Sequence, residues 1–217
     1  MNGEAPVSEG PCTHFVLFWP FSDFQSQAID LNDISALIDF SYPGGFKACV
    51  SYCIENKLPL ISGTTGLTDE HLELVSTAKK SIPILLASNM SIGIANLKSS
   101  IEKYLSSISI SSTCKIIEIH HTKKKDAPSG TAIEIQKFIE NLPESKVVSS
   151  IDIESLRIGN IYGIHRIEFE NAEGKTTFQH IANSRNIFAI GALQAARWIK
   201  SKEIGEYSFA DFLNKKL

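Results

Sequence analysis

The fold is constrained most by a regular alternation of short apolar runs and amphipathic segments between residues 36 and 88. The apolar runs have the length of buried strands and stop at glycine, proline or serine; they are Ala36–Ser41, Leu58–Gly66 and Ile82–Ser88. The segment Phe46–Asn56 spaces its apolar side chains along one face of a helix. A second helix is expected from Thr68, because Asp69 and Glu70 suit the positive end of a helix dipole. This order of strands and helices predicts a parallel sheet with right-handed crossovers.

The pattern differs on both sides of this alternation. Upstream, the compact apolar run His14–Trp19, which Pro20 ends, predicts one more strand. Downstream, the expected elements are a helix over Ile94–Ile108, a strand over Cys114–His121 and a helix over Ser129–Asn141. Three strand-like runs follow, "SLRIG", "IHRIEFEN" and "KTTFQHIAN", with a hairpin through Glu173–Gly174, and then a helix over Ile187–Ile199. We therefore expect an α/β layer and then an α+β layer with an open mixed sheet. The chain changes domain near Asn89 and returns near Phe188.

Composition narrows the class of protein. A net charge of −3 and a pI near 6.1 argue against a general nucleic-acid binder. No apolar run approaches the roughly 18 residues that span a bilayer, and the N-terminus lacks the basic start of a signal peptide, so no membrane partner and a cytoplasmic location are expected. The four cysteines form no CxxC pair. Cys49 and Cys53 would share a helical face, which fits buried reduced thiols better than a metal site, and no metal is expected.

Three loops follow predicted parallel strands at their carboxyl ends. They are Asp39–Pro43, Gly63–Gly66 and Ala87–Met90. In open α/β sheets ligands bind at that edge, and glycines allow the backbone to approach a ligand closely. The Gly63–Gly66 loop taken alone also fits a tight turn from strand to helix. Two such loops side by side favour a shared ligand.

The stretch "EIHHTKKKDAPSGTAIEI", Glu118–Ile135, gathers two histidines and three lysines just before a helix start. Serine and threonine cap free amides there, and the helix dipole attracts anions. A histidine can give or take a proton near neutral pH. The stretch therefore describes either a pocket for a small anion, such as a carboxylate or phosphate, or a solvated basic loop before a capped helix. The paired histidines at the end of a strand favour the pocket.

This stretch resembles the signature of the dihydrodipicolinate reductase family, which reads E-x-H-H-x-x-K-x-D-A-P-S-G-T-A. The segments "LIDFSYP", "ISGTTGLTDEHLELV" and "ASNMSIGIANL" resemble three consecutive segments of that family. "GNIYGIHRIEF", "HIANSRNIFAIGALQAARWI" and "SFADFL" resemble its C-terminal part. The likeness runs from about Asp33 to the end of the chain. It implies a reductase of the diaminopimelate and lysine pathway, which transfers hydride from NADH or NADPH to the cyclic imine derived from 4-hydroxy-tetrahydrodipicolinate and gives tetrahydrodipicolinate.

The resemblance also implies roles for individual residues. His120 resembles the family's proposed acid and Lys124 its partner lysine, so these two are the expected catalytic residues. The residues expected to hold the dicarboxylate substrate are His121, Ser129, Gly130 and Thr131. Those expected to bind the cofactor are Gly63, Thr64, Thr65, Ala87, Ser88, Asn89, Met90, Arg185 and Phe188.

The expected fold class is α/β. It consists of a shortened Rossmann-like parallel-sheet domain plus an α+β domain with an open mixed sheet. Residues 1–89 and 188–217 are expected to bind the dinucleotide, and residues 90–187 to bind substrate and to form the oligomer. The resemblance implies a homotetramer built through the outer face of the mixed sheet, with Ile164, Phe169 and Phe178 or their alternates on that face. If the source is a plant, the resemblance extends the expected location to the plastid.

One departure from the family pattern concerns the N-terminal region. The family begins with a strand and a turn of the G-x-x-G-R-M-G kind, which places the cofactor pyrophosphate on a helix N-terminus. Here "WPFSDFQ" follows the first predicted strand, without a glycine, and Pro20 removes one amide. Two hypotheses result. The first is a working reductase with an altered pyrophosphate site. The second is a non-catalytic or weakly active relative that binds a small dicarboxylate or acts through subunit assembly.

Overall fold

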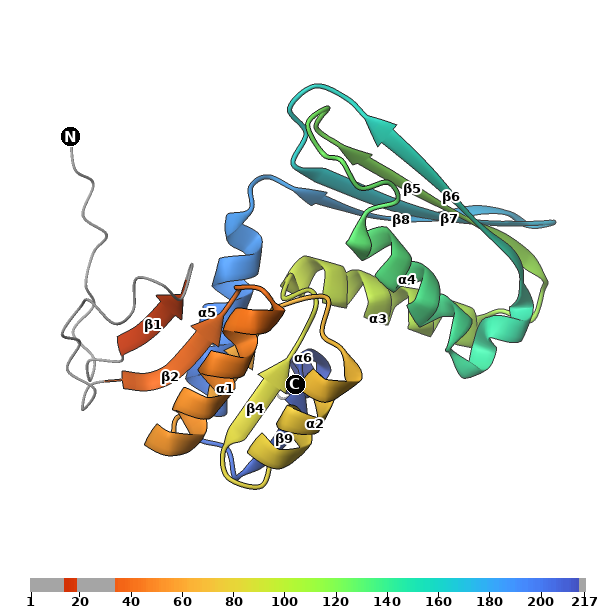
Figure 1. Ribbon diagram of the computed structural model, residues 1–217. Coiled ribbons are helices and arrows are strands. Elements are labelled where there is room, and N and C mark those ends of the chain that lie inside the picture. The colour runs from red at the N-terminus through yellow and green to blue at the C-terminus, as the bar shows by residue number, and fades with distance from the viewer. Residues whose placement is uncertain (1–13, 19–33, 215–217) are drawn as a thin grey trace, which may run out of the picture. The chain divides into compact units, whose positions relative to one another are not determined.

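The computed structural model describes residues 14–18 and 34–214 of the chain (Figure 1). Two compact units result, one formed by Met1–Met90 with Ile190–Leu217 and the other by Ser91–Ala189. We call these the first and the second unit. The expected functions of the two domains are treated below as proposals.

The first unit is built on a parallel sheet. Its strands are β1 (His14–Phe18), β2 (Ile34–Asp39), β3 (Leu60–Ser62), β4 (Pro83–Leu86) and β9 (Gly205–Ser208), in the order β1-β2-β3-β4-β9. Every neighbouring pair in this sheet is parallel, as the alternation of strands and helices predicted. The carboxyl ends of these strands therefore share one edge of the sheet.

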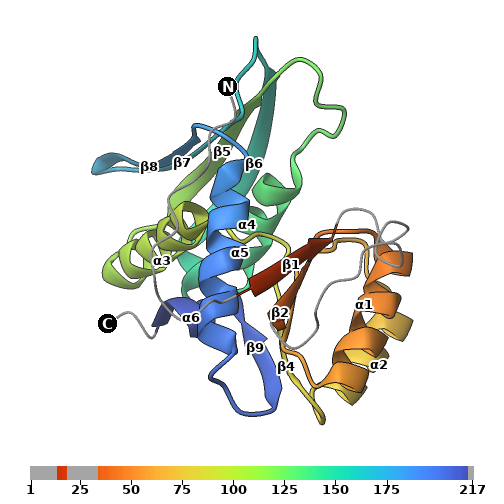
Figure 2. The same cartoon turned by 90° about the vertical axis from the view of Figure 1, so that its left-hand side faces the viewer.

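Helices α1 (Pro43–Asn56) and α2 (Asp69–Ala78) lie together on one side of this sheet (Figure 2). The core beneath them contains Phe46, Cys49 and Cys53 of α1, all with no exposed surface. Burial raises the pKa of the Cys49 thiol to about 12, so the thiol stays protonated. Both helical cysteines are free and buried, which confirms the interpretation as reduced core thiols. Among the described residues, no cluster of histidine, cysteine or acidic side chains is arranged to hold a metal ion.

The chain re-enters the first unit at Ile190, within α5 (Asn186–Ile199), and closes it with β9 and α6 (Phe209–Leu213). Gly191 of α5 lies directly on the backbone of Met90, where an added Cβ would come within 1.8 Å of the Met90 carbonyl oxygen. The sequence predicted α5 but missed β9 and α6, which are short elements without an extended periodic pattern.

The second unit is a mixed four-stranded sheet covered by helices. It contains α3 (Ile92–Ser107), β5 (Ser112–His120), α4 (Gly130–Glu140), the 3-10 helix η3 (Pro143–Val147), β6 (Val148–Arg157), β7 (Gly163–Asn171) and β8 (Gly174–Ala182). The strand order is β6-β5-β7-β8, with β5 parallel to β6 and antiparallel to β7. The expected hairpin joins β7 to β8, and Gly174 takes a φ of 137° that favours glycine. The mixed sheet was correctly predicted.

Helices α3 and α4 cover the same face of this sheet (Figure 1). Ile164 belongs to the opposite, outer face, as expected, but Phe169 and Phe178 do not. These two rings pack with Tyr104 of α3, at centroid distances of 5.4 and 5.5 Å, in the core beneath the sheet. The expectation for the two phenylalanines was wrong because side chains alternate along a strand, so positions 164 and 169 point to opposite faces. No described helix is both long and apolar enough to cross a membrane.

Candidate active site

The candidate site begins with two side chains at the end of β5. Glu118 and His120 are two residues apart on this strand, so both point to the face that α3 and α4 cover. Glu118 has no exposed surface and His120 is 8% exposed. The chain then leaves the sheet as a loop over residues 121–129 and enters α4.

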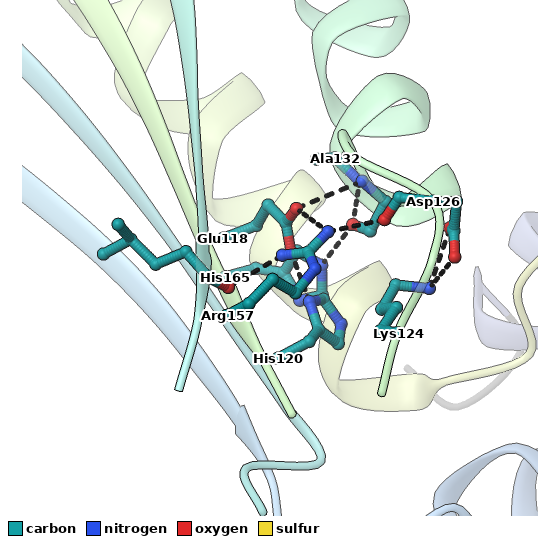
Figure 3. A network of polar contacts seen from close by, with 9 residues as sticks. Glu118, His120, Lys124, Asp126, Ala132, Arg157 and His165 are labelled. Carbon is teal, nitrogen blue, oxygen red and sulfur yellow. Dashed lines mark hydrogen bonds and ion pairs between the residues drawn. The ribbon is translucent and has the colours of Figure 1, made fainter. Parts of the chain in front are cut away.

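The Glu118 carboxylate has hydrogen-bonding partners on several elements (Figure 3). Oε2 contacts Nδ1 of His120 in a short hydrogen bond. Oε1 accepts hydrogen bonds from Nη2 of Arg157 on β6, at 2.8 Å, and from the backbone amide of Ser129, at 3.3 Å. Burial opposes ionisation of Glu118, but hydrogen bonds from Arg157, Ser155 and His120 lower its pKa below the usual range. Glu118 is therefore an ionised carboxylate at neutral pH.

The electrostatic surroundings of His120 act in opposite directions. Burial lowers its pKa, and the positive charges of Lys124 and Arg157 lower it further. The hydrogen bond to Glu118 and the negative charge of that carboxylate oppose the shift. The net direction is downward, so the pKa of His120 lies below its usual value and the ring at rest is mainly neutral at pH 7.

His165 of β7 lies next to His120 on the covered face. The ring centroids are 5.2 Å apart and the planes meet at 73°. Burial lowers the pKa of His165 to about 4, with a further contribution from His120, so His165 is neutral at physiological pH. Its Nε2 lies 3.2 Å from Oγ of Ser129, which also caps α4 by accepting a hydrogen bond from the Ala132 amide at 3.2 Å.

Lys124 and Asp126 form the outer part of the site. Nζ of Lys124 lies 2.8 Å from both carboxylate oxygens of Asp126. The backbone carbonyl of Asp126 accepts a hydrogen bond from Nη2 of Arg157 at 2.5 Å. Arg157 therefore connects the loop that carries Lys124 to Glu118 inside the unit, as Figure 3 shows.

The structure brings the predicted catalytic and substrate residues into one region of the second unit. His120 and His121 lie where β5 meets the loop, Lys124 lies within the loop, and Gly130 and Thr131 form the first turn of α4. Ser129 lies beside them at the start of α4. Its amide donates to Glu118, and its hydroxyl accepts from the Ala132 amide and lies 3.2 Å from Nε2 of His165.

Sequence reasoning missed Glu118, Asp126, Arg157 and His165 as site residues. Strand alternation carried a signal for two of them. Glu118 has the same parity as His120, and His165 has the same parity as the buried Ile167 and Phe169. Arg157 could not be found in this way, because its position opposite His120 depends on the pairing register of β5 with β6.

In the first unit, Asp39 organises the loops after β2 and β3. This fully buried carboxylate accepts four hydrogen bonds. Oδ1 accepts from the amide and hydroxyl of Ser41, at 2.9 and 2.5 Å. Oδ2 accepts from the hydroxyls of Ser62 and Thr64, at 2.7 and 2.8 Å. Two adjacent loops at the carboxyl edge of the sheet are thus fixed by one side chain.

The predicted cofactor residues of the first unit lie along this edge. Gly63 packs under the Phe40 ring, where an added Cβ would come within 2.2 Å, and its amide bonds to the Asp39 carbonyl at 2.8 Å. The Ala87 amide bonds to the Ser62 carbonyl at 3.0 Å, which ties the loop after β4 to β3. The others on this edge are Thr64 and Met90, which are buried, and Thr65, Ser88 and Asn89, which are more exposed. Arg185 and Phe188 belong to the second unit, where Arg185 is exposed just before α5 and Phe188 lies in its first turn.

Comparison with known proteins identifies the family. Residues 93–213 match the family model "Dihydrodipicolinate reductase, C-terminus", and residues 17–90 match "Dihydrodipicolinate reductase, N-terminus". A protein of Bdellovibrio bacteriovorus named 4-hydroxy-tetrahydrodipicolinate reductase is 38% identical over 87% of this chain and 78% of its own length. A protein of the same name from Alkaliphilus oremlandii is also 38% identical, over 84% of this chain and 81% of its own.

Among solved structures, the dipicolinate-bound dihydrodipicolinate reductase of Paenisporosarcina sp. TG-14 resembles this fold with a TM-score of 0.65. It is 23% identical, and the match covers 80% of this chain and 71% of that one. A likeness at this identity concerns the fold, and it agrees with the family models that cover both units. The chain therefore belongs to the dihydrodipicolinate reductase family.

Proposed function

We propose that this chain reduces the cyclic imine derived from 4-hydroxy-tetrahydrodipicolinate with a nicotinamide cofactor, giving tetrahydrodipicolinate for diaminopimelate and lysine synthesis. The observation that supports this most is the pairing of His120 with the buried carboxylate of Glu118, beside Lys124 and the start of α4. Nothing in the described site or in the comparisons favours the alternative of a non-catalytic relative.

In the proposed reaction the second unit handles protons and carboxylates. The bound cofactor, NADH or NADPH, supplies a hydride equivalent. Protonated His120 would act as the acid, because the reduced ring must gain a proton as well as a hydride. Lys124, His121 and the α4 first turn at Gly130 and Thr131 would hold the substrate carboxylates, since a cation and a helix N-terminus both attract anions.

The cofactor residues of the first unit fit the nicotinamide half of a dinucleotide. The loops after β2, β3 and β4 lie at the carboxyl edge of a parallel sheet, where such ligands bind. The buried Asp39 fixes two of these loops from below, which leaves their outer backbone groups in set positions. We propose that Gly63–Thr65 and Ala87–Met90 receive the nicotinamide. Arg185 and Phe188 of the second unit are further proposed cofactor residues.

The test is oxidation of NADH or NADPH, followed spectrophotometrically, with freshly prepared substrate. Wild-type protein should turn over, and His120→Gln or Lys124→Ala should lower kcat by about 10²–10⁴-fold if that residue is the general acid. Near-normal turnover in both variants would remove the two residues from the mechanism. No turnover by the wild type with either nucleotide would contradict the proposed activity.

A binding experiment tests the carboxylate pocket separately. Pyridine-2,6-dicarboxylate should bind or inhibit, and pyridine-2-carboxylate should bind much more weakly because it loses one set of charge-assisted hydrogen bonds. The dipicolinate complex of the Paenisporosarcina relative supports this choice of probe. Equal affinity for the two compounds would argue against a pocket for two carboxylates.

We also propose a cytoplasmic location, in keeping with the bacterial biosynthetic relatives.

We further propose a homotetramer that is assembled through the outer face of the mixed sheet. An apolar row crosses all four strands on that face; in register it comprises Leu156, Ile119, Ile164 and Ile181. Ile181 is 52% exposed in the single chain. An apolar row of this kind on an open sheet is typical of a surface that another copy covers.

A further inference from the structure

Glu118 is a buried carboxylate that meets groups from its own strand β5, from β6 and from the start of α4. Its Oε1 accepts hydrogen bonds from Arg157 and from the Ser129 amide, and its Oε2 contacts His120. Ser155, which lies opposite Glu118 in the register of β5 and β6, also donates to the carboxylate. Both oxygens therefore act as acceptors, and the side chain has no exposed surface through which water could replace a lost partner.

These partners determine which nitrogen of His120 carries hydrogen. An ionised carboxylate has no proton to donate, so Nδ1 must be the donor in its contact with Glu118. The neutral ring then has its lone pair on Nε2, and the cationic ring presents an Nε2–H. Nε2 lies only 3.0 Å from the position that a Cβ on Gly163 would take, so the glycine leaves room for this end of the ring. Proton exchange with a substrate therefore takes place at Nε2.

Oε1 of Glu118 is connected to Lys124 indirectly, through Arg157 and then Asp126. Arg157 uses the same Nη2 to reach Glu118 Oε1 and the Asp126 carbonyl. Asp126 in turn holds the Lys124 ammonium through both carboxylate oxygens. Glu118 thus connects the strand that carries the histidine to the loop that carries the lysine.

We propose that Glu118 is the positioning residue of the reductase site: it fixes His120 with hydrogen on Nδ1, so that Nε2 exchanges the proton, and through Arg157 it anchors the loop that bears Lys124. This inference rests on the proposed role of His120.

The charged and titratable groups around His120 determine in which direction each variant should move the pKa of His120. They are Glu118 on β5, Lys124 and Asp126 in the loop, Arg157 on β6 and His165 on β7. Burial and the charges of Lys124 and Arg157 lower the pKa of His120, whereas Glu118 raises it. Removing the negative charge of Glu118 must therefore lower the pKa of His120 further, and removing the positive charge of Arg157 must raise it.

The deciding variant is Glu118→Gln, which replaces two acceptor oxygens by one oxygen and one NH₂ group. Arg157 and the Ser129 amide are both donors and require the oxygen. The NH₂ group then faces Nδ1 of His120, which has to become an acceptor. The neutral ring should change from the Nδ1–H to the Nε2–H tautomer, as ¹⁵N spectra of histidine-labelled protein would show.

The same variant should alter the pH dependence of turnover. A general acid must be protonated, so kcat falls as the pH rises past the pKa of His120. In Glu118→Gln this alkaline limb should move to lower pH, and in Arg157→Gln it should move to higher pH. The fall in kcat for Glu118→Gln at its own optimum should be smaller than the about 10²–10⁴-fold loss expected on removing the acid itself.

A matched control is Glu154→Gln on β6. Glu154 is an outer-face carboxylate, 42% exposed, that pairs with Lys115. This control should leave the His120 tautomer and the pH profile unchanged. An unchanged tautomer and an unchanged alkaline limb in folded Glu118→Gln protein would overturn the proposal.

Two further measurements keep the outcomes separate. If Glu118→Gln does not fold, the wild-type spectrum decides, because a neutral His120 with hydrogen on Nε2 is incompatible with the proposed contact. If His120→Gln retains full activity, the proposed acid is wrong, whatever the tautomer in the wild type. Failure of the positioning role and failure of the proposed acid are therefore distinguishable.

Discussion

At the scale of single residues, the site is defined by side chains whose protonation is fixed by burial. His165 is 5% exposed, and burial lowers its pKa to about 4, so it stays neutral beside His120. Because burial keeps His165 neutral, this residue lowers the stability of the folded protein in acid. Between pH 6.5 and about 4 the unfolded chain binds a proton that the folded chain does not, and stability therefore declines as the pH falls through this window.

Replacing His165 by glutamine should flatten part of this acid decline. Glutamine can still accept a hydrogen bond from Ser129 but does not titrate. The difference in unfolding free energy between the two proteins should change by roughly 3 kcal/mol between pH 7 and pH 4. Urea unfolding at a series of pH values measures this difference. Parallel stability curves for the two proteins would show that His165 is not held neutral by burial.

Gly163 gives a second prediction at this scale. Its φ lies outside the left-handed region, so alanine is allowed by the backbone, yet the added Cβ would lie 3.0 Å from Nε2 of His120. Gly163→Ala should therefore lower kcat by displacing the ring, with little change in thermal stability. Neither of two other glycines is a suitable control. Gly159→Ala would add backbone strain, because the φ of Gly159 is 52°. Gly130→Ala would have open space and an ordinary φ, but Gly130 lies in the proposed pocket. Loss of fold in Gly163→Ala, rather than loss of turnover, would contradict this prediction.

At the scale of elements, the sequence predicted the long periodic segments well. The helices α1, α3 and α5 and the strands β5 and β7 were predicted from segments with helical or alternating apolar patterns, and β2 from a short continuous apolar run. The strand β6 begins at Val148, before the expected run at "SLRIG". The alternation of Ile151 and Ile153 with the polar Asp152 and Glu154 is a strand signal that the prediction missed. The candidate site was found as a loop and a helix start, but the cross-strand partners that order it depend on register.

Asp39 gives a prediction at the scale of elements, because its carboxylate fixes two loops. Asp39→Asn should lose about 1.5–3 kcal/mol of stability, because the carboxylate gives up charge-assisted hydrogen bonds in a buried place. Nucleotide affinity should fall with it if these loops receive the nicotinamide. Denaturant unfolding and isothermal titration with NADH and NADPH measure the two effects, and Asp69→Asn at the exposed start of α2 is the control. Unchanged stability would show that the hydroxyl partners can rotate to satisfy asparagine.

At the scale of the whole molecule, the predictions concern the nucleotide site and the assembly face. The pyrophosphate half of the nucleotide site was predicted to be altered, and the segment concerned, residues 19–33, lies outside the described residues. The strand before it, β1, runs parallel to β2, so its carboxyl end reaches the edge that carries the proposed cofactor loops. The chain between β1 and β2 contains no glycine, lysine or arginine, while Asp23, Asp30 and Asp33 add negative charge.

We therefore predict weak dinucleotide binding by this chain. The dissociation constant should lie nearer 10⁻⁴ M than 10⁻⁶ M, a difference of about 2.7 kcal/mol, because two phosphate charges lack the usual glycine-rich helix start. Isothermal titration with NADH and NADPH at one salt concentration makes the measurement. Low-micromolar affinity for either nucleotide would mean that another part of the chain, or a neighbouring subunit, holds the pyrophosphate.

Assembly through the outer face gives a further prediction. Replacing Ile164 by aspartate places a charge in the middle of the apolar row and should dissociate the proposed tetramer. Light scattering at micromolar concentration reports the mass, and Glu168→Gln, a change on the same strand and face outside the row, is the control. A wild-type monomer at that concentration would rule out the homotetramer.

The end of β5 lies between the proposed assembly face and the candidate site. Ile119 points outward into the apolar row, while Glu118 and His120 on either side of it point inward to the site. A neighbouring copy that covers Ile119 would stiffen the backbone that aims the histidine, although it contributes no atom to the chemistry. Specific activity should then fall when the protein is diluted below the concentration at which its subunits separate, and should return when the solution is concentrated again.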